Sequence, residues 1–224
     1  MTTDKIVVID GPSGSGKSTV SRAAAAELGW SLLDTGSVYR ALTWFALQRG
    51  VDLTDQDAVV ALLPEFFSLW QLSTRPNESW VRVGDTDVSD AIRTTEISAV
   101  VSHVATNLRV REAVNKRFRE ILAGAAESGI IAEGRDLTTV VAPDAPVRIL
   151  ITASEAERIR RRQAERGSDN AAAVAATISE RDVRDATVSN FTSAAAGVIE
   201  IDTTELDLDT VIATVVDIIR KAQA

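Results

Sequence analysis

The sequence predicts an α/β protein with a parallel five-stranded sheet flanked by helices. The first observation is a strand, a glycine-rich loop and a helix that follow one another at the start of the 224-residue chain. The second is that short apolar strands alternate with helical patterns over residues 101–224. The third is a different, antiparallel pattern between residues 51 and 100, which indicates an insertion into the main fold.

The first strand is the β-branched run Ile6-Val7-Val8-Ile9, which is typical of a strand that is buried on both faces. The glycine-rich loop occupies residues 11–19. Alanine and leucine favour a helix over residues 20–28, and Gly29 is placed to end it as a C-cap. This order places the loop at the carboxyl end of a strand and at the amino end of a helix.

The remaining elements follow from the same patterns. Apolar runs predict four further strands, at residues 31–34, 129–133, 147–151 and 198–201. Helical periodicity predicts helices at residues 38–48, 109–126, 155–166, 171–185 and 209–222. In the insertion, residues 69–73 and 80–83 alternate, and Gly84-Asp85 predicts a turn before residues 86–88. We place the boundaries of the insertion near residues 41 and 101, so that residues 1–40 and 101–224 form the core.

Composition excludes several classes of function. The 24 basic and 32 acidic residues give a net charge of −8, which argues against a broad nucleic-acid-binding surface. The chain has no cysteine and one histidine, so disulfides, thiolate metal sites and multi-histidine metal centres within one chain are impossible. We find no apolar run long enough to span a membrane and no secretory leader, and we therefore expect a cytoplasmic protein.

Residues 11–18 match the pattern GxxxxGK followed by serine or threonine, in the strand-to-helix setting that this motif requires. Its backbone N–H groups can converge on phosphate oxygens, Lys17 can reach the β- and γ-phosphates, and the Ser18 hydroxyl can ligate Mg²⁺. The alternative is a glycine-rich turn that binds nothing. A GTPase is disfavoured because no Asn-Lys-x-Asp segment follows the loop.

A second polar loop, residues 33–40, begins at a predicted strand end, so it should lie beside the glycine loop at the same edge of the sheet. Its hydroxyl and Arg40 could bind a second phosphate. The alternative is a helix that is capped by Asp34 or Thr35, with Arg40 in solvent. The quartet of residues 133–136 also follows a strand and is better explained by a nucleotide than by core packing, with a solvated turn as the alternative.

Arginines are concentrated on two predicted helices. Arg109 and Arg111 lie near a helix start, where cations oppose the helix dipole unless an anion is bound. The helix over residues 155–166 presents a band of four arginines, which either pair with glutamates on a solvated surface or close over transferring phosphates. The band consists of Arg158, Arg161, Arg162 and Arg166. Arg181 and Asp185 lie four residues apart and either pair with each other or face a ligand.

Taken in order, these motifs resemble the nucleoside monophosphate kinases and, within them, the bacterial cytidylate kinases. The matching stretches run nearly end to end. They are GPSGSGKST at 11–19, LLDTGSVYRALT at 32–43, DVSDAIRT at 87–94, RVRE at 109–112, EGRDLTTVVAPDAPVRILITAS at 133–154 and ERDVRD at 180–185. Any one of them could arise by chance, but the ordered set is specific.

The resemblance implies a P-loop kinase core, a nucleoside-monophosphate-binding insertion and an arginine-rich lid at about residues 154–172. It implies an enzyme that uses ATP and Mg²⁺ to phosphorylate CMP and dCMP. The ATP phosphates would lie on Gly11, Pro12, Ser13, Gly14, Ser15, Gly16, Lys17, Ser18 and Thr19. The acceptor nucleotide would contact Thr35, Arg40, Ser102, Arg111, Arg135, Asp136, Arg181 and Asp185. Lys17, Arg158 and Arg162 would be catalytic, and Ser18 and Asp34 would hold the metal ion.

The sequence departs from the family pattern at one place. Val188 stands where the family usually has an arginine, and Ser189-Asn190-Phe191-Thr192 replaces the usual Ser-Pro-Leu. We consider Arg184 as a substitute. Two other functions remain open on the residues alone: a kinase of another nucleoside monophosphate such as UMP or AMP, and a regulatory nucleotide-binding module or ATPase. We expect a monomer whose partners are small nucleotides.

Overall fold

A computed structural model of the chain describes residues 5–166 and 182–223, without the side chains of residues 165 and 166. Its main sheet is parallel and has the strand order β2-β6-β1-β7-β8. The strands are β1 (Ile6–Asp10), β2 (Ser31–Asp34), β6 (Ile130–Gly134), β7 (Val147–Thr152) and β8 (Ile199–Asp202). The predicted five-stranded parallel sheet is therefore confirmed, with each strand within one residue of its expected position.

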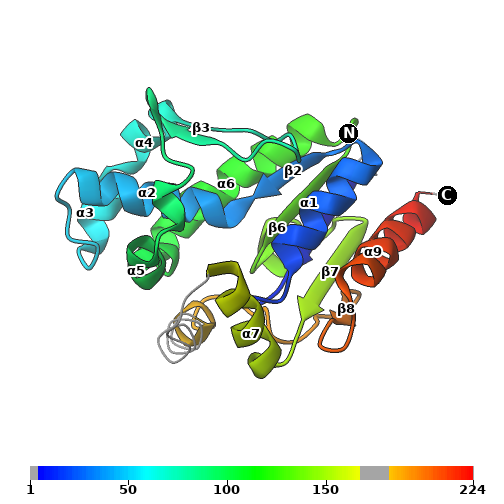
Figure 1. Cartoon of the computed structure of the whole chain (residues 1–224). Helices are drawn as coiled ribbons and strands as arrows, with labels where there is room; N and C mark the ends of the chain where they lie inside the picture. The colour runs from blue at the N-terminus through cyan, green and yellow to red at the C-terminus, as the bar shows by residue number, and fades with distance from the viewer. Residues whose placement is uncertain (1–4, 167–181, 224) are drawn as a thin grey trace.

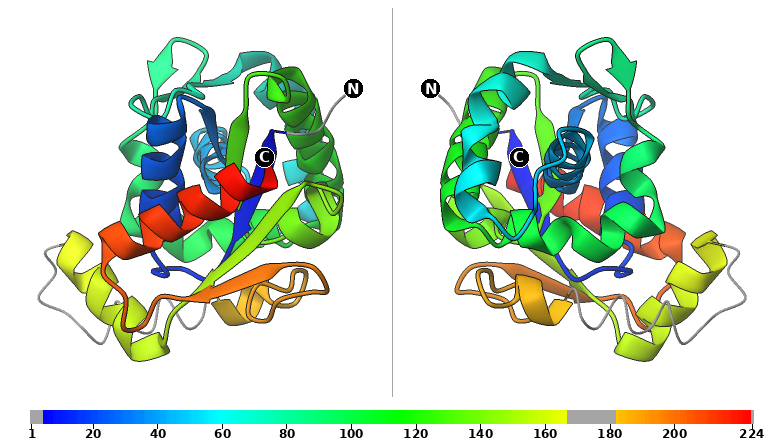
Figure 2. Two further views of the ribbon diagram at one scale, coloured as in Figure 1. Left: turned by 90° about the vertical axis from the view of Figure 1, so that its right-hand side faces the viewer. Right: turned by 90° about the vertical axis from the view of Figure 1, so that its left-hand side faces the viewer.

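Helices cover both faces of this sheet (Figures 1 and 2). Because side chains alternate along a strand, Val7 and Ile9 of β1 face one layer and Ile6 and Val8 face the other. The first layer contains α1 (Lys17–Leu28) and α9 (Leu208–Ala222). The second contains α2 (Thr35–Gln48), α5 (Thr95–Ala105) and α6 (Leu108–Ala125). Apolar strands buried on both faces are thus explained by a three-layer fold.

The insertion contains a second, antiparallel sheet, as the alternating pattern predicts. It consists of β3 (Trp70–Leu72), β4 (Val81–Val83) and β5 (Thr86–Asp87). Sequence analysis did not predict α3 (Gln56–Ala61), α4 (Leu63–Leu69), α5 or the 3₁₀ turn η1 (Ala91–Arg93). Helices α2 and α5 run through positions 41 and 101, so no break in secondary structure marks the boundaries placed there.

The carboxyl ends of the parallel strands meet at one edge of the main sheet, and the segment that follows each strand lies there. Helix α7 (Glu155–Arg166) follows β7 and lies at this edge (Figure 1). A Cβ atom added to Gly14 of the glycine loop would come within 2.7 Å of the Arg158 carbonyl oxygen, so the helix backbone packs directly on the loop. The expected helix at 171–185 is described only from residue 182 onward.

No helix in residues 5–166 or 182–223 is long and apolar enough to cross a bilayer.

Candidate active site

A single pocket of about 440 Å³ at the carboxyl edge of the sheet joins the motifs that the sequence analysis selected. Its lining comes from the glycine loop, the start of α2, the end of β6, and α6 and α7. The predicted site residues that line it are Ser13, Gly14, Gly16, Lys17, Ser18, Thr19, Asp34, Thr35, Arg40, Arg111, Arg135, Asp136, Arg162 and Asp185. Arg181 and the side chain of Arg166 lie outside the described residues.

The glycine loop directs backbone N–H groups and a cation toward one part of the pocket. Gly14 and Gly16 have φ angles of +80° and +90°, which residues other than glycine rarely adopt. Helix α1 begins immediately afterwards at Lys17, and its N-cap is Gly16, which has no side chain to occupy the first N–H groups. The Lys17 ammonium donates to the carbonyl oxygen of Pro12 at 3.2 Å. Backbone donors, the helix dipole and a cation therefore converge on one end of the pocket.

Glu133 is a buried carboxylate beside this loop that the sequence analysis did not assign as a site residue. The Ser18 hydroxyl donates to its Oε2 at 2.7 Å. Burial, followed by the nearby charge of Asp34, raises the pKa of Glu133 to about 7, while Lys17 and the Ser18 hydrogen bond act in the opposite direction. The available signal was its place at the end of a buried strand, because acidic residues are seldom buried there without a partner.

The β2–α2 junction combines a helix cap with a pocket wall. The Asp34 side chain accepts a hydrogen bond from the backbone N–H of Ser37 at 3.0 Å and so caps α2. Thr35 donates to the Glu133 carbonyl oxygen at 2.6 Å, which ties α2 to β6. Arg40 is not left in solvent: it donates to the carbonyl oxygen of Ile92 at 3.1 Å and to the Ser98 hydroxyl at 2.9 Å. The capping interpretation is thus confirmed for Asp34, and Thr35 and Arg40 line the pocket.

A nearly buried ion pair forms another part of the pocket. Arg111 of α6 pairs with Asp136, and their side chains are only 11% and 9% exposed. Arg111 also donates to the carbonyl oxygen of Ala105 at 2.9 Å, which fixes the direction of its guanidinium. Burial raises the pKa of Asp136, and Arg111 counteracts that effect. Two charged groups with fixed orientation in an open pocket provide both hydrogen-bond donors and acceptors to a ligand.

A second group of charges links Arg135 and Arg158 to the residues that precede β8. The Nη1 atom of Arg135 lies 2.9 Å from Asp182 Oδ1 and 2.9 Å from Asp185 Oδ2. Arg158 donates to Asp182 at 2.5 Å and to the carbonyl oxygen of Ser13 in the glycine loop at 3.0 Å. Ser102 does not line the pocket itself, but its hydroxyl donates to Asp185 Oδ1 at 2.8 Å. The sequence analysis did not single out Asp182, which joins the two arginines.

The position at which the family usually has an arginine is filled differently. Val188 is half-buried in the turn that follows residue 185, and its N–H donates to the Asp185 carbonyl oxygen. Arg184, the considered substitute, is exposed, and Ser189 lines the pocket in this segment instead.

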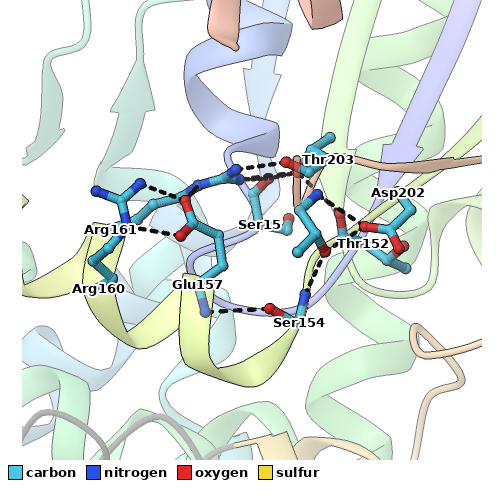
Figure 3. Close-up of polar contacts among 9 residues, drawn as sticks. Ser15, Thr152, Ser154, Glu157, Arg160, Arg161, Asp202 and Thr203 are labelled. Atoms are coloured by element: carbon cyan, nitrogen blue, oxygen red, sulfur yellow. Dashed lines mark hydrogen bonds and ion pairs between the residues drawn. The ribbon is translucent and has the colours of Figure 1, made fainter. Parts of the chain in front are cut away.

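Arg161 anchors α7 to the core, as Figure 3 shows. Its guanidinium donates to the carbonyl oxygen of Ser15 at 3.2 Å and to the hydroxyl and carbonyl oxygens of Thr203 at 2.9 and 2.7 Å. Glu157, one turn earlier, accepts from Arg161 at 2.7 Å and also binds Arg160. The arginines of the band therefore differ in their contacts. Arg161 binds the glycine loop through the Ser15 carbonyl oxygen, whereas Arg162 lines the pocket.

Asp10 connects the glycine loop to the residues that follow Asp136. It ends β1, is fully buried, and accepts hydrogen bonds from the backbone N–H groups of Leu137 and Thr138 at 3.1 and 2.7 Å. The Thr138 hydroxyl donates to it as well, at 2.7 Å. Burial raises the pKa of Asp10 to about 6, although these hydrogen bonds oppose the shift. One buried carboxyl group thus sets the spacing between two walls of the pocket.

The chain is similar to known proteins over almost its whole length. Residues 7–221 match the family model described as cytidylate kinase. A cytidylate kinase of Streptomyces avermitilis is 40% identical over 98% of this chain and 94% of its own length. One from Cutibacterium acnes is 43% identical and covers 97% of both chains. Among solved structures, a gluconokinase from Sinorhizobium meliloti aligns with a TM-score of 0.52 at 14% identity, over 99% of this chain and 94% of that one, which shows a shared fold.

Proposed function

The chain belongs to the cytidylate kinase family, and we propose that its pocket brings ATP and CMP or dCMP together for transfer of the γ-phosphoryl group. The enzyme is a phosphotransferase that acts on CMP. The observation that supports our assignment of residues is that the glycine loop and the Arg111–Asp136 pair line one pocket of about 440 Å³. A donor site and a selective acceptor site in one pocket are what a transfer between two nucleotides needs.

We assign the ATP phosphates to the glycine loop, residues 11–19. Gly14 and Gly16 have positive φ angles, and the start of α1 carries no side-chain cap, so its first N–H groups are available to phosphate oxygens. Lys17 is the cation within reach of the β- and γ-phosphates. Arg158 of α7 donates to the Ser13 carbonyl oxygen of the loop and Arg162 of the same helix lines the pocket, which supports assigning both to the transferring phosphate.

The donor set at the end of β6 fits Mg²⁺, because it consists of hard oxygen ligands. Ser18, Asp34 and the buried Glu133 would hold the ion together with phosphate oxygens and water. No group of three or more metal-binding side chains occurs in the described parts of the chain, so the proposed ion would have to take much of its coordination from phosphate oxygens and water. When bound, Mg²⁺ would offset charge on the transferring phosphate.

We assign the cytosine ring to Arg111, Asp136 and Ser102, and the acceptor phosphate to Thr35, Arg40 and Arg135. Arg111 presents donors and Asp136 an acceptor at fixed positions, which suits the polar edge of a base. Arg40 and Arg135 are two further guanidinium groups that line the same pocket. We assign Asp185, which contacts Ser102 and Arg135, to the sugar of the acceptor nucleotide. Arg181 belongs to the same proposal but lies outside the described residues.

The transfer needs little covalent help from the protein. An oxygen of the acceptor phosphate attacks the γ-phosphorus as the bond to the β-phosphate oxygen breaks, and this nucleophile is already an anion. The site therefore requires no general base, in agreement with a chain whose only histidine, His103, lies in the last turn of α5. These pocket residues would act by alignment and by stabilising the negative charge that spreads over the transferring group.

An acceptor panel tests this proposal. Release of ADP from MgATP should be stimulated by CMP and dCMP, and much less by UMP, AMP or GMP. ATP hydrolysis that no nucleoside monophosphate changes would refute the assignment and favour a regulatory ATPase. We further propose that the enzyme works as a cytoplasmic monomer, which gel filtration can test; the acidic net charge supports a protein that does not act on nucleic acid.

A further inference from the structure

The aromatic ring of Phe191 lies against the guanidinium group of Arg135. The Cζ atom of Arg135 is 4.5 Å from the ring centroid, within the range of a cation–π contact. Phe191 is fully buried, and the Arg135 side chain is only 13% exposed. The contact is therefore largely shielded from water, and a cation–π interaction is strongest when it is shielded in this way.

Three groups from one segment hold this guanidinium. Asp182 Oδ1 and Asp185 Oδ2 each lie 2.9 Å from Nη1, and the Cζ atom lies over the ring of Phe191. Arg135 itself follows β6, about fifty residues earlier in the chain, and it lines the pocket. The two carboxylates satisfy charge, but they do not fix the plane of the guanidinium. A flat aromatic face does, because a stacked guanidinium must lie roughly parallel to the ring.

We infer that Phe191 is a positioning residue: its ring holds the Arg135 guanidinium in the orientation that receives the acceptor phosphate. This inference rests on the acceptor site proposed above. The simpler alternative is that Phe191 only fills the core. The two differ in what they require of the side chain, since core filling needs apolar volume whereas positioning needs the negative face of an aromatic ring.

Two changes at position 191 separate these roles. Phe191→Leu keeps an apolar side chain of similar size but removes the ring. Pentafluorophenylalanine at position 191 keeps the shape of the ring and reverses the polarity of its face. Under our inference, both raise the dissociation constant of CMP by about five- to thirty-fold, which is the fold-change that corresponds to a shielded cation–π contact. The KM for ATP stays within about twofold, because the donor loop is untouched.

Ile219→Ala is the control for lost stability alone. Ile219 of α9 is also fully buried, but it packs on the other face of the sheet and does not line the pocket. This variant should lower the melting temperature as Phe191→Leu does, without changing the affinity for CMP. A double-mutant cycle completes the test: in an Arg135→Ala background, Phe191→Leu should no longer alter CMP binding.

Calorimetric titration of CMP decides the outcome. Wild-type affinity in the pentafluorophenylalanine protein, or an undiminished Phe191→Leu effect in the Arg135→Ala background, would overturn the inference while the acceptor site stands. A wild-type protein that binds no CMP would instead refute the proposed function, and the inference with it.

Discussion

Substitution of Gly14 by alanine tests whether α7 is docked on the glycine loop. Gly14 has a φ angle of +80°, so any side chain there costs roughly 1–2 kcal/mol of backbone strain. The new Cβ atom would also lie 2.7 Å from the Arg158 carbonyl oxygen and 3.1 Å from the Arg158 Cβ atom. To reach ordinary contact distance, the helix must retreat by about 0.5 Å or more.

That retreat breaks contacts on which the loop depends. Arg161 donates to the Ser15 carbonyl oxygen at 3.2 Å, and the added separation takes this bond beyond hydrogen-bonding range. A hydrogen bond from a charged donor contributes about 1.5–3 kcal/mol. We therefore expect Gly14→Ala to lower the free energy of unfolding by about 3 kcal/mol or more. Because the loop donors shift against the ATP phosphates, we also expect kcat/KM for ATP to fall at least about tenfold.

Gly29→Ala is the control for backbone strain alone. Gly29 has a φ angle of +69° but no atom within 4 Å of an added Cβ. This variant should lose only about 1 kcal/mol and keep wild-type kinetics. Urea denaturation and steady-state kinetics with varied ATP compare the two proteins. Equal losses of stability together with unchanged kinetics in Gly14→Ala would show that α7 does not support the loop.

Three further predictions follow from the pocket. Lys17→Ala should cost at least about 3 kcal/mol of transition-state stabilisation, and near-normal single-turnover rates would remove the loop from the donor role. The pKa of Asp10 is raised from 3.8 to about 6, so the folded protein binds more protons than the unfolded chain in that interval, and this contribution to stability is lost as the pH rises through it. The stability of wild type relative to Asp10→Asn should therefore fall by about 2.5 kcal/mol between pH 4 and pH 7; parallel pH curves from urea denaturation would contradict this. Arg111→Lys keeps the charge but loses the planar fork that faces Asp136, and we expect a roughly tenfold higher KM for CMP with an unchanged KM for ATP; equal changes in both constants would point to a general disturbance.

The sequence was sufficient for the main sheet because its strands are short and apolar, and the inner strands β1, β6 and β7 are buried on both faces. Helices α3 and α4 were not predicted because they are only six and seven residues long, and α4 includes Pro64. Helices this short have too few turns to show a clear hydrophobic periodicity. Helix α5 was not predicted for another reason. Much of its own sequence is a run of apolar residues, and such a run does not distinguish a buried helix from a strand.

Motifs predicted which loops converge, whereas the division of labour among the charged side chains required the structure. Arg158, Arg161 and Arg162 are equivalent in a helical pattern, yet Arg161 turns toward Thr203 and Arg162 toward the pocket. Glu133 was visible as part of a charged quartet, but its partnership with Ser18 joins residues 115 positions apart. Contacts of that range depend on the packed sheet and cannot be deduced from local spacing.

The placement of Asp10 bears on how such an enzyme changes during evolution. In the proposed site, backbone groups that hydrogen-bond to the Asp10 carboxylate form the frame between donor and acceptor, whereas base selection would depend on a few side chains such as Arg111 and Asp136. Substitutions that exchange one nucleobase for another can thus accumulate without altering the reach of the phosphoryl group. A fold built in this way can diversify its substrates while its chemistry stays constant.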